Sequence, residues 1–248
     1  MSTWIATLYK AVTSTLVSVA VRTADCLSPL YKPIISAGTE ELPEDMAKKV
    51  SIANTICLVT ALMLFVPGTL YTLHSGLWGI YIPAVIEAIL FCCIIYLNKK
   101  RLYNIASTSM LMLHCACAAY FGILLGQLIN ITLAAVFLFG LSFLIYSKPR
   151  QQLTGLSATL ATVVLLELNY YYGLFPPMEL SVADQYLLRW IALPCALLLD
   201  VLVMTFYIRE NQGLYHRLKM FVYKVSHELR NQLNAMALAA QLIKREIK

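Results

Sequence analysis

Six stretches of mostly apolar residues constrain the fold of this chain more than any other feature of its sequence. An α-helix needs about 20 apolar residues to cross the roughly 30 Å of hydrocarbon in a bilayer. Only 13% of the 248 residues are charged and 60% are hydrophobic, which is too little polar surface for a water-soluble domain. We therefore expect an all-α membrane protein with six transmembrane helices. The predicted spans are Ile52–Leu73, Gly79–Leu97, Ile105–Leu125, Leu128–Tyr146, Leu153–Leu174 and Leu187–Ile208.

The positions of Lys and Arg predict how these spans are oriented. The segment before the first span, the turns after the second and fourth spans, and the tail hold 18 of the 19 basic residues. The remaining one, Arg189, lies at the edge of the last span. Because basic residues accumulate on the cytoplasmic side of a membrane, both termini are expected in the cytoplasm. The loops on the other side are too short for an extracellular sensor domain, apart from residues 173–186.

The chain divides into three expected regions. Residues 1–50 form a cytoplasmic segment, 51–208 the six-helix membrane domain, and 209–248 a linker with a further helix. Within the first region, apolar residues recur at helical spacing over Ser2–Arg22, opposite Ser, Thr and Lys. This stretch is predicted to lie on membrane lipid at the inner leaflet, with a poorly formed signal peptide as the alternative.

The cysteines and the charge exclude several classes of site. None of the seven cysteines forms a Cys-x-x-Cys pair, so we expect neither a zinc site nor a disulfide framework. The net charge of +6 follows from the basic cytoplasmic loops and requires no nucleic acid partner. No metal site is predicted.

The tail contains a repeating apolar seam. Apolar residues at positions 218, 222, 225, 229, 233, 236, 240, 243 and 247 are separated by steps of three and four. This spacing is typical of a coiled-coil-like helix, and it predicts a homodimer formed through the 218–247 helix. His227 lies off the seam, two residues from Val225 and from Leu229, and is therefore expected to point toward solvent.

Around this histidine the sequence reads Ser226-His227-Glu228-Leu229-Arg230-Asn231, with an aromatic residue six positions before the histidine and Leu233-Asn234 after it. This stretch resembles the phosphoacceptor box of bacterial sensor histidine kinases, which belongs to their dimerisation and histidine-phosphotransfer domain. The resemblance implies a two-component signalling protein of the bacterial inner (plasma) membrane. One position departs from the family pattern, because Gln232 stands where proline is usual, so the helix kink below the histidine is in doubt.

The resemblance also implies roles for three residues. His227 would be the nucleophile that attacks the γ-phosphate of ATP, and Glu228 would orient the imidazole or accept its proton. Asn231 would take part in removing phosphate from a partner response regulator or phosphorelay protein. ATP and Mg²⁺ are implied for a complete kinase, but the 248 residues contain none of the Gly-rich boxes of an ATP-binding domain. We expect a kinase fragment or a naturally short chain, and leave open whether it is itself an enzyme.

The layout of six short-looped helices before a phosphoacceptor helix resembles the quorum-sensing kinases that detect α-hydroxyketone autoinducers (the CqsS and LqsS type). This resemblance implies a small, mostly apolar ligand bound within the membrane. Polar side chains inside spans are costly and usually face the bundle interior, so they are the candidates for lining such a site. They are Glu87, His114, Glu167, Asn169, Tyr170, Trp190 and Asp200. Estimated depths place His114 and Asp200 close enough to pair, and the alternative is that these groups only join helix to helix.

Two other functions remain open on the sequence alone. A small six-helix transporter could use Glu87, His114, Glu167 and Asp200 as a proton relay, although the paired Gly/Pro breaks of transporter sites are missing. A non-catalytic partner could instead dimerise with complete kinases and so titrate them, which would withdraw kinase chains from their own dimers.

Overall fold

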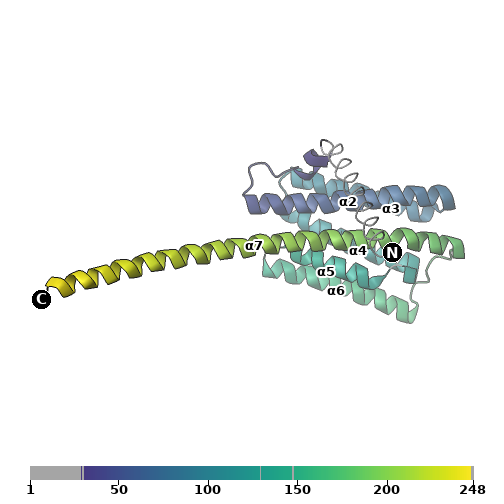
Figure 1. The fold of residues 1–248 in the computed structure, drawn as a ribbon. Helices are drawn as coiled ribbons and strands as arrows, with labels where there is room; N and C mark the ends of the chain where they lie inside the picture. Colours follow the sequence, from purple (N-terminus) through teal and green to yellow (C-terminus); the bar gives the residue numbers. More distant parts are fainter. Residues whose placement is uncertain (1–28, 30, 129, 147, 247–248) are drawn as a thin grey trace, which may run out of the picture. The chain divides into compact units, whose positions relative to one another are not determined.

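The structure is a computed structural model that describes residues 29, 31–128, 130–146 and 148–246. The predicted interfacial helix over Ser2–Arg22 lies outside these residues. Within the described part the chain is all-helical and contains no strand, as the sequence predicts (Figure 1). The elements from α2 onward are α2 (Glu44–Ser75), α3 (Trp78–Lys99), α4 (Tyr103–Leu125), the short 3₁₀ helix η1 (Gly126–Leu128), α5 (Ile131–Ile145), α6 (Pro149–Tyr172) and α7 (Val182–Glu246).

Five of these helical segments are long and apolar enough to cross a membrane. They comprise α2, α3, α4 together with η1, α6, and the first part of α7. The helix α5 is shorter than the predicted span 128–146, because its 15 residues extend only about 22 Å. Long apolar helices are thus confirmed, whereas a sixth complete crossing stays a prediction.

Local signals set several helix ends. Gly76 and Gly173 follow α2 and α6 with φ of 70° and 61°, a left-handed conformation that glycine adopts without strain and that ends a helix. Asn130 caps α5, because its side-chain oxygen accepts the backbone N–H groups of Thr132 and Leu133. Pro149 occupies the first turn of α6, where no backbone donor is needed. Helix ends therefore follow these local signals, and they do not coincide with the limits of the apolar stretches.

The chain forms two compact units, Met1–Val203 and Met204–Lys248, and the helix α7 runs through both. In the first unit α2 packs on α3, α3 on α4, and α6 on both α4 and α5 (Figure 1). Glycines permit close helix contacts, since a Cβ at Gly122 would lie 2.6 Å from the Leu166 side chain. Large apolar side chains such as Leu70 and Leu153 are 63% and 66% exposed, as expected for surfaces that face lipid.

Two buried amides attach the N-terminal segment to the helices at one end of the bundle. The Asn54 side-chain nitrogen donates to the backbone oxygens of Ile35 (3.0 Å) and Ala37 (2.9 Å). The Asn98 side-chain nitrogen donates to the Asn54 side-chain oxygen at 2.8 Å. Because Asn54 and Asn98 are 0% and 3% exposed, these bonds satisfy polar groups that water does not reach.

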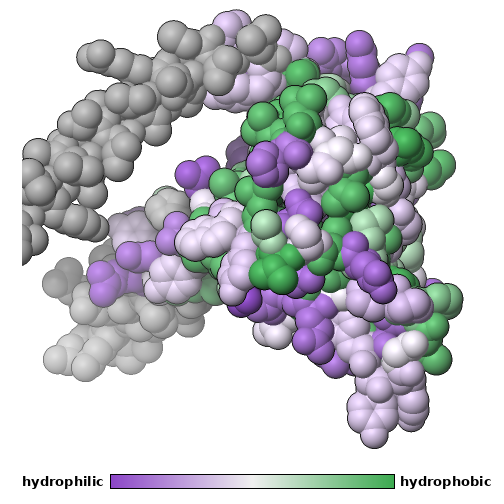
Figure 2. Space-filling view, turned by 90° about the vertical axis from the view of Figure 1, so that its right-hand side faces the viewer, coloured by the Kyte–Doolittle hydropathy of each residue, from purple (hydrophilic) through white to green (hydrophobic). Residues whose placement is uncertain are grey.

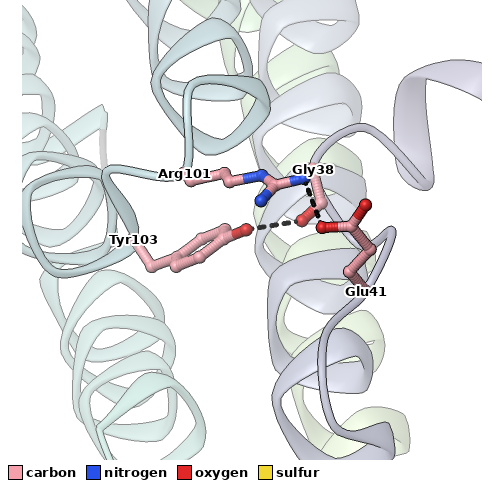
Figure 3. A network of polar contacts seen from close by, with 4 residues as sticks. All are labelled: Gly38, Glu41, Arg101 and Tyr103. Carbon is pink, nitrogen blue, oxygen red and sulfur yellow. Dashed lines mark hydrogen bonds and ion pairs between the residues drawn. The ribbon is translucent and has the colours of Figure 1, made fainter.

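The same segment is also held by the turn between α3 and α4 (Figure 3). The Tyr103 hydroxyl donates to the Gly38 carbonyl at 2.8 Å, and the Arg101 guanidinium pairs with the Glu41 carboxylate at 2.9 Å. Gly38 has a φ of +78° and lies against the Asn98 backbone carbonyl. We call residues 35–41 with these partners the N-terminal clasp. It places the N-terminal segment and the basic α3–α4 turn at the same end of the bundle.

Candidate functional site

The first unit contains a cavity of about 740 Å³ between its helices. Residues of α2, α3, α4, η1, α5, α6 and α7 line it, and most of the lining side chains are apolar. The α7 contribution runs from Leu188 to Leu199. Figure 2 looks onto the end of the bundle that carries the α2–α3 and α6–α7 connections, where hydrophilic side chains lie scattered among hydrophobic ones. Volume and lining are in the range of sites for small ligands.

His114 lies in the wall of this cavity with both ring nitrogens engaged. Its Nδ1 lies 2.8 Å from the Met110 backbone oxygen, and its Nε2 lies 3.2 Å from the Thr60 hydroxyl. A carbonyl oxygen only accepts, so Nδ1 carries the hydrogen, and the neutral ring accepts the Thr60 hydroxyl at Nε2. The rings of Phe91 and Phe137 lie 4.4 and 5.1 Å away from the imidazole, and this apolar burial favours the neutral ring.

Tyr71 also lines the cavity, and sequence reasoning did not identify it. Its side chain is only 2% exposed, and its hydroxyl has no hydrogen-bond partner among the described residues. It belongs to an apolar cluster with Ile80, Leu125 and Leu188. Its only sequence signal is a helical stripe, because Thr60, Leu64, Pro67 and Tyr71 recur on one face of α2.

The structure brings three of the seven predicted lining residues to the cavity, namely His114, Glu167 and Tyr170. The Tyr170 hydroxyl is engaged, since it lies 2.7 Å from the Gly126 carbonyl and 3.1 Å from that of Gly122. Glu167 is exposed. His114 and Tyr170 thus line the cavity and also form hydrogen bonds between helical segments, so a ligand role for them stays a prediction.

The other four predicted residues do not line the cavity. The Asn169 side-chain oxygen accepts the Phe175 backbone N–H at 2.8 Å and so orders the chain after α6. Trp190 is 76% exposed on α7. Glu87 contacts the Cys117 thiol, and its Oε2 atom is buried without a hydrogen-bond partner in the described residues. The Asp200 Oδ1 atom is likewise buried without one, and the expected pairing with His114 is not formed, because other groups engage both ring nitrogens.

The cysteines of the described part are free thiols, distributed over α2, α3, α4 and α7. No three His, Cys, Asp or Glu side chains among the described residues gather where they could hold a metal ion. The mostly apolar lining of the cavity suits an organic molecule held by apolar contacts and a few hydrogen bonds.

The predicted phosphoacceptor lies in the second unit, on the same continuous helix α7. The side chains of His227 and Glu228 are exposed, and the Tyr223 ring centroid lies 6.5 Å from that of His227. The Asn231 side chain lies outside the described residues, although α7 continues through this position and through Gln232. The seam residues Leu218 and Val222 are 59% and 56% exposed.

Comparisons of the chain with protein-family models, with curated proteins and with solved structures found no match.

Proposed function

We propose that this chain is the membrane sensor part of a two-component histidine kinase. A single observation carries the proposal: α7 lines the cavity with residues 188–199 and continues without a break to the Ser-His-Glu-Leu-Arg-Asn stretch around His227. A ligand in the cavity would therefore contact the helix that bears the phosphoacceptor. A small, mostly apolar signal, such as an α-hydroxyketone autoinducer, fits the lining.

The proposed reaction requires an accessible imidazole beside a carboxylate. A ring nitrogen of His227 attacks the γ-phosphorus of ATP, an N–P bond forms, and the bond to the ADP oxygen breaks. Glu228 accepts the ring proton or orients the imidazole. ATP and Mg²⁺ are held by a kinase catalytic domain, for which this sequence carries no motif. The phosphate then passes to an aspartate of a response regulator or to a phosphorelay protein, and Asn231 acts in the reverse removal of phosphate.

We further propose a multi-pass protein of the bacterial inner membrane with six crossings and both termini in the cytoplasm. The N-terminal clasp supports this arrangement, because it holds the N-terminal segment against the basic turn Lys99–Arg101. The exposed apolar seam on α7 supports a homodimer, since Leu218, Val222 and Val225 would be buried by a second copy.

Labelling with phosphate tests the proposal directly. The chain is joined to a kinase catalytic region, or mixed with a complete kinase partner, and incubated with radioactive ATP. We expect an acid-labile phosphoramidate on His227 that is lost in His227→Gln. His216→Gln is the matched control on the same helix and should label normally. Labelling that survives His227→Gln would contradict the assignment.

The two alternatives give different results. A non-catalytic partner would take phosphate only from a complete kinase, never from a catalytic region joined to its own tail. A proton-relay transporter would move protons across liposomes, and Glu87→Gln would abolish that movement. The structure gives little support to the transporter, because α2, α3 and α6 are unbroken helices through the described spans, despite Pro67 and Pro83.

A further inference from the structure

The exposed polar residues of the cavity lining gather at one end of the bundle. Five of the six described lining residues that are exposed are polar, and they are Gln127, Asn130, Thr132, Glu167 and Arg189. They lie near the end that carries the α2–α3 and α6–α7 connections, which Figure 2 views. The Met178 backbone N–H donates to the Leu124 carbonyl at 2.8 Å and holds the α6–α7 connection there. The cavity thus has a polar mouth in front of a mostly apolar interior.

Two opposite charges lie in this mouth without pairing. Glu167 lies about 8 Å before the end of α6 at Tyr172, and Arg189 about 10 Å after the start of α7 at Val182, so their depths are similar. Neither side chain forms an ion pair with a residue that the structure describes. Trp190, next to Arg189, is 76% exposed, and exposed aromatic side chains are typical of the headgroup level of a bilayer. A guanidinium and a carboxylate are therefore both available to a headgroup.

The interior behind the mouth suits a hydrocarbon chain. Its α2 wall includes Leu64 and Pro67, and its α7 wall includes Ala192 and Ala196. The sixth exposed lining residue, Leu193, is apolar and 41% exposed on α7, so the lining also reaches the lipid-facing surface of the bundle. A chain could enter sideways from the bilayer at this position, while the polar head of the same molecule stays at the mouth.

We propose that the mouth binds the zwitterionic headgroup of a diacyl phospholipid of the phosphatidylethanolamine class. The Arg189 guanidinium binds the phosphate, for which its planar donors are suited, and the Glu167 carboxylate accepts N–H groups of the primary ammonium. One acyl chain occupies the cavity and the other stays in the bilayer. A purely anionic head would be repelled by Glu167, and a purely cationic head by Arg189.

This inference concerns a resident membrane lipid and does not rest on the proposed function. It has one consequence for signalling, since a diffusible signal in the same cavity would have to displace the acyl chain.

Photolabelling of the full chain in phosphatidylcholine liposomes tests the inference. The probe is a phosphatidylethanolamine with a diazirine in one acyl chain, and mass spectrometry identifies the labelled residues. We expect saturable labelling of cavity-lining residues. Unlabelled phosphatidylethanolamine should compete better than phosphatidylglycerol, which has the phosphate but no ammonium. Glycerophosphoethanolamine, the same headgroup without chains, should hardly compete, which separates a lipid from a soluble phosphate ester.

Two variants test the two halves of the headgroup site. Glu167→Gln should weaken the apparent affinity for the probe roughly threefold to tenfold, the size of one hydrogen bond, and should abolish the preference over phosphatidylglycerol. Arg189→Gln should weaken the affinities for both lipids by similar factors, because both carry the phosphate. Glu179→Gln and Arg150→Gln are the matched controls, since both residues are exposed and do not line the cavity. Both controls should bind like the parent chain.

Four results would overturn the inference. They are equal competition by the two phospholipids in the parent chain, an unchanged preference in Glu167→Gln, labelling confined to residues outside the cavity, and strong competition by the headgroup alone. The preference is a ratio of two affinities within one variant, so a loss of folded protein does not mimic its change. The assay contains no ATP, so its failure would leave the phosphoacceptor assignment standing, and failure to phosphorylate His227 would leave the lipid inference standing.

Discussion

At the scale of single residues, the hydrogen bond between Thr60 and His114 joins α2 to α4 in the cavity wall. Thr60→Val removes the donor to Nε2 and leaves a buried acceptor unpaired, which should lower the free energy of unfolding by about 1–3 kcal/mol. Chemical unfolding in detergent micelles measures this loss. Thr154→Val is the control, because Thr154 is exposed and bonds only to its own helix backbone. Equal losses in both variants would show that the His114 contact contributes nothing.

Residue identities in the site could be predicted only in part. His114 carries a signal in the sequence, since an ionisable ring within an apolar stretch must face the bundle interior. Tyr71 carries only the weak signal of a helical stripe on α2, because a tyrosine within a span is common at membrane boundaries and its hydroxyl usually finds water or a partner. Whether that hydroxyl is buried without a partner depends on how the connections after α2 and α6 pack, and sequence periodicity does not contain this information.

At the scale of elements, the N-terminal clasp depends on a glycine. Gly38→Ala would place a Cβ 2.1 Å from the Asn98 backbone oxygen, in a residue with φ of +78°. Gly76→Ala is a matched control, because Gly76 has φ of +70° but no atoms within 4 Å of a Cβ. Both variants carry backbone strain of about 1 kcal/mol, and only the first also has the clash. We expect Gly38→Ala to lose at least about 2 kcal/mol more unfolding free energy and to expose residues 39–43 to protease. Equal stability would contradict the clasp.

The helices themselves were largely predictable, and the differences have a physical cause. Apolar length marks where the chain can lie in lipid, so the predicted spans fall within or close to α2, α3, α4, α6 and α7. Helix ends depend instead on local chemistry. The helix α2 begins at Glu44, after Pro43 and with acidic residues in its first turn, and α5 begins only after its cap Asn130. The clasp was not predicted, because it joins residues 17 to 65 positions apart through side chains that look like ordinary polar residues in the sequence.

At the scale of the whole molecule, the cavity lining and His227, the proposed phosphoacceptor, share one helix. A ligand can shift an equilibrium only by its differential affinity for two arrangements, so the proposed signalling requires two arrangements of α7 that the cavity distinguishes. Between the cavity and His227, Val203 lies against the α5 glycine Gly140, and Gly213 is a position where helix stability is reduced. If the ligand acts by rotating α7 about its axis, the response should depend on which face of the helix His227 occupies. Inserted residues change that face.

An insertion series after Gly213 tests this dependence. One added residue turns the following helix by about 100°, whereas seven turn it by about 700°, within about 20° of the starting face. If α7 transmits rotation, the one-residue insertion should abolish or invert the effect of ligand on His227 phosphorylation, and the seven-residue insertion should restore it. Phosphate labelling with and without ligand, using the same kinase catalytic region throughout, measures both effects. Basal labelling provides the control, because His227 remains exposed in every variant. A response that declines steadily with insertion length would instead show that rotation of α7 does not carry the signal. The ligand would then act on the proposed phosphoacceptor through contacts between the two copies.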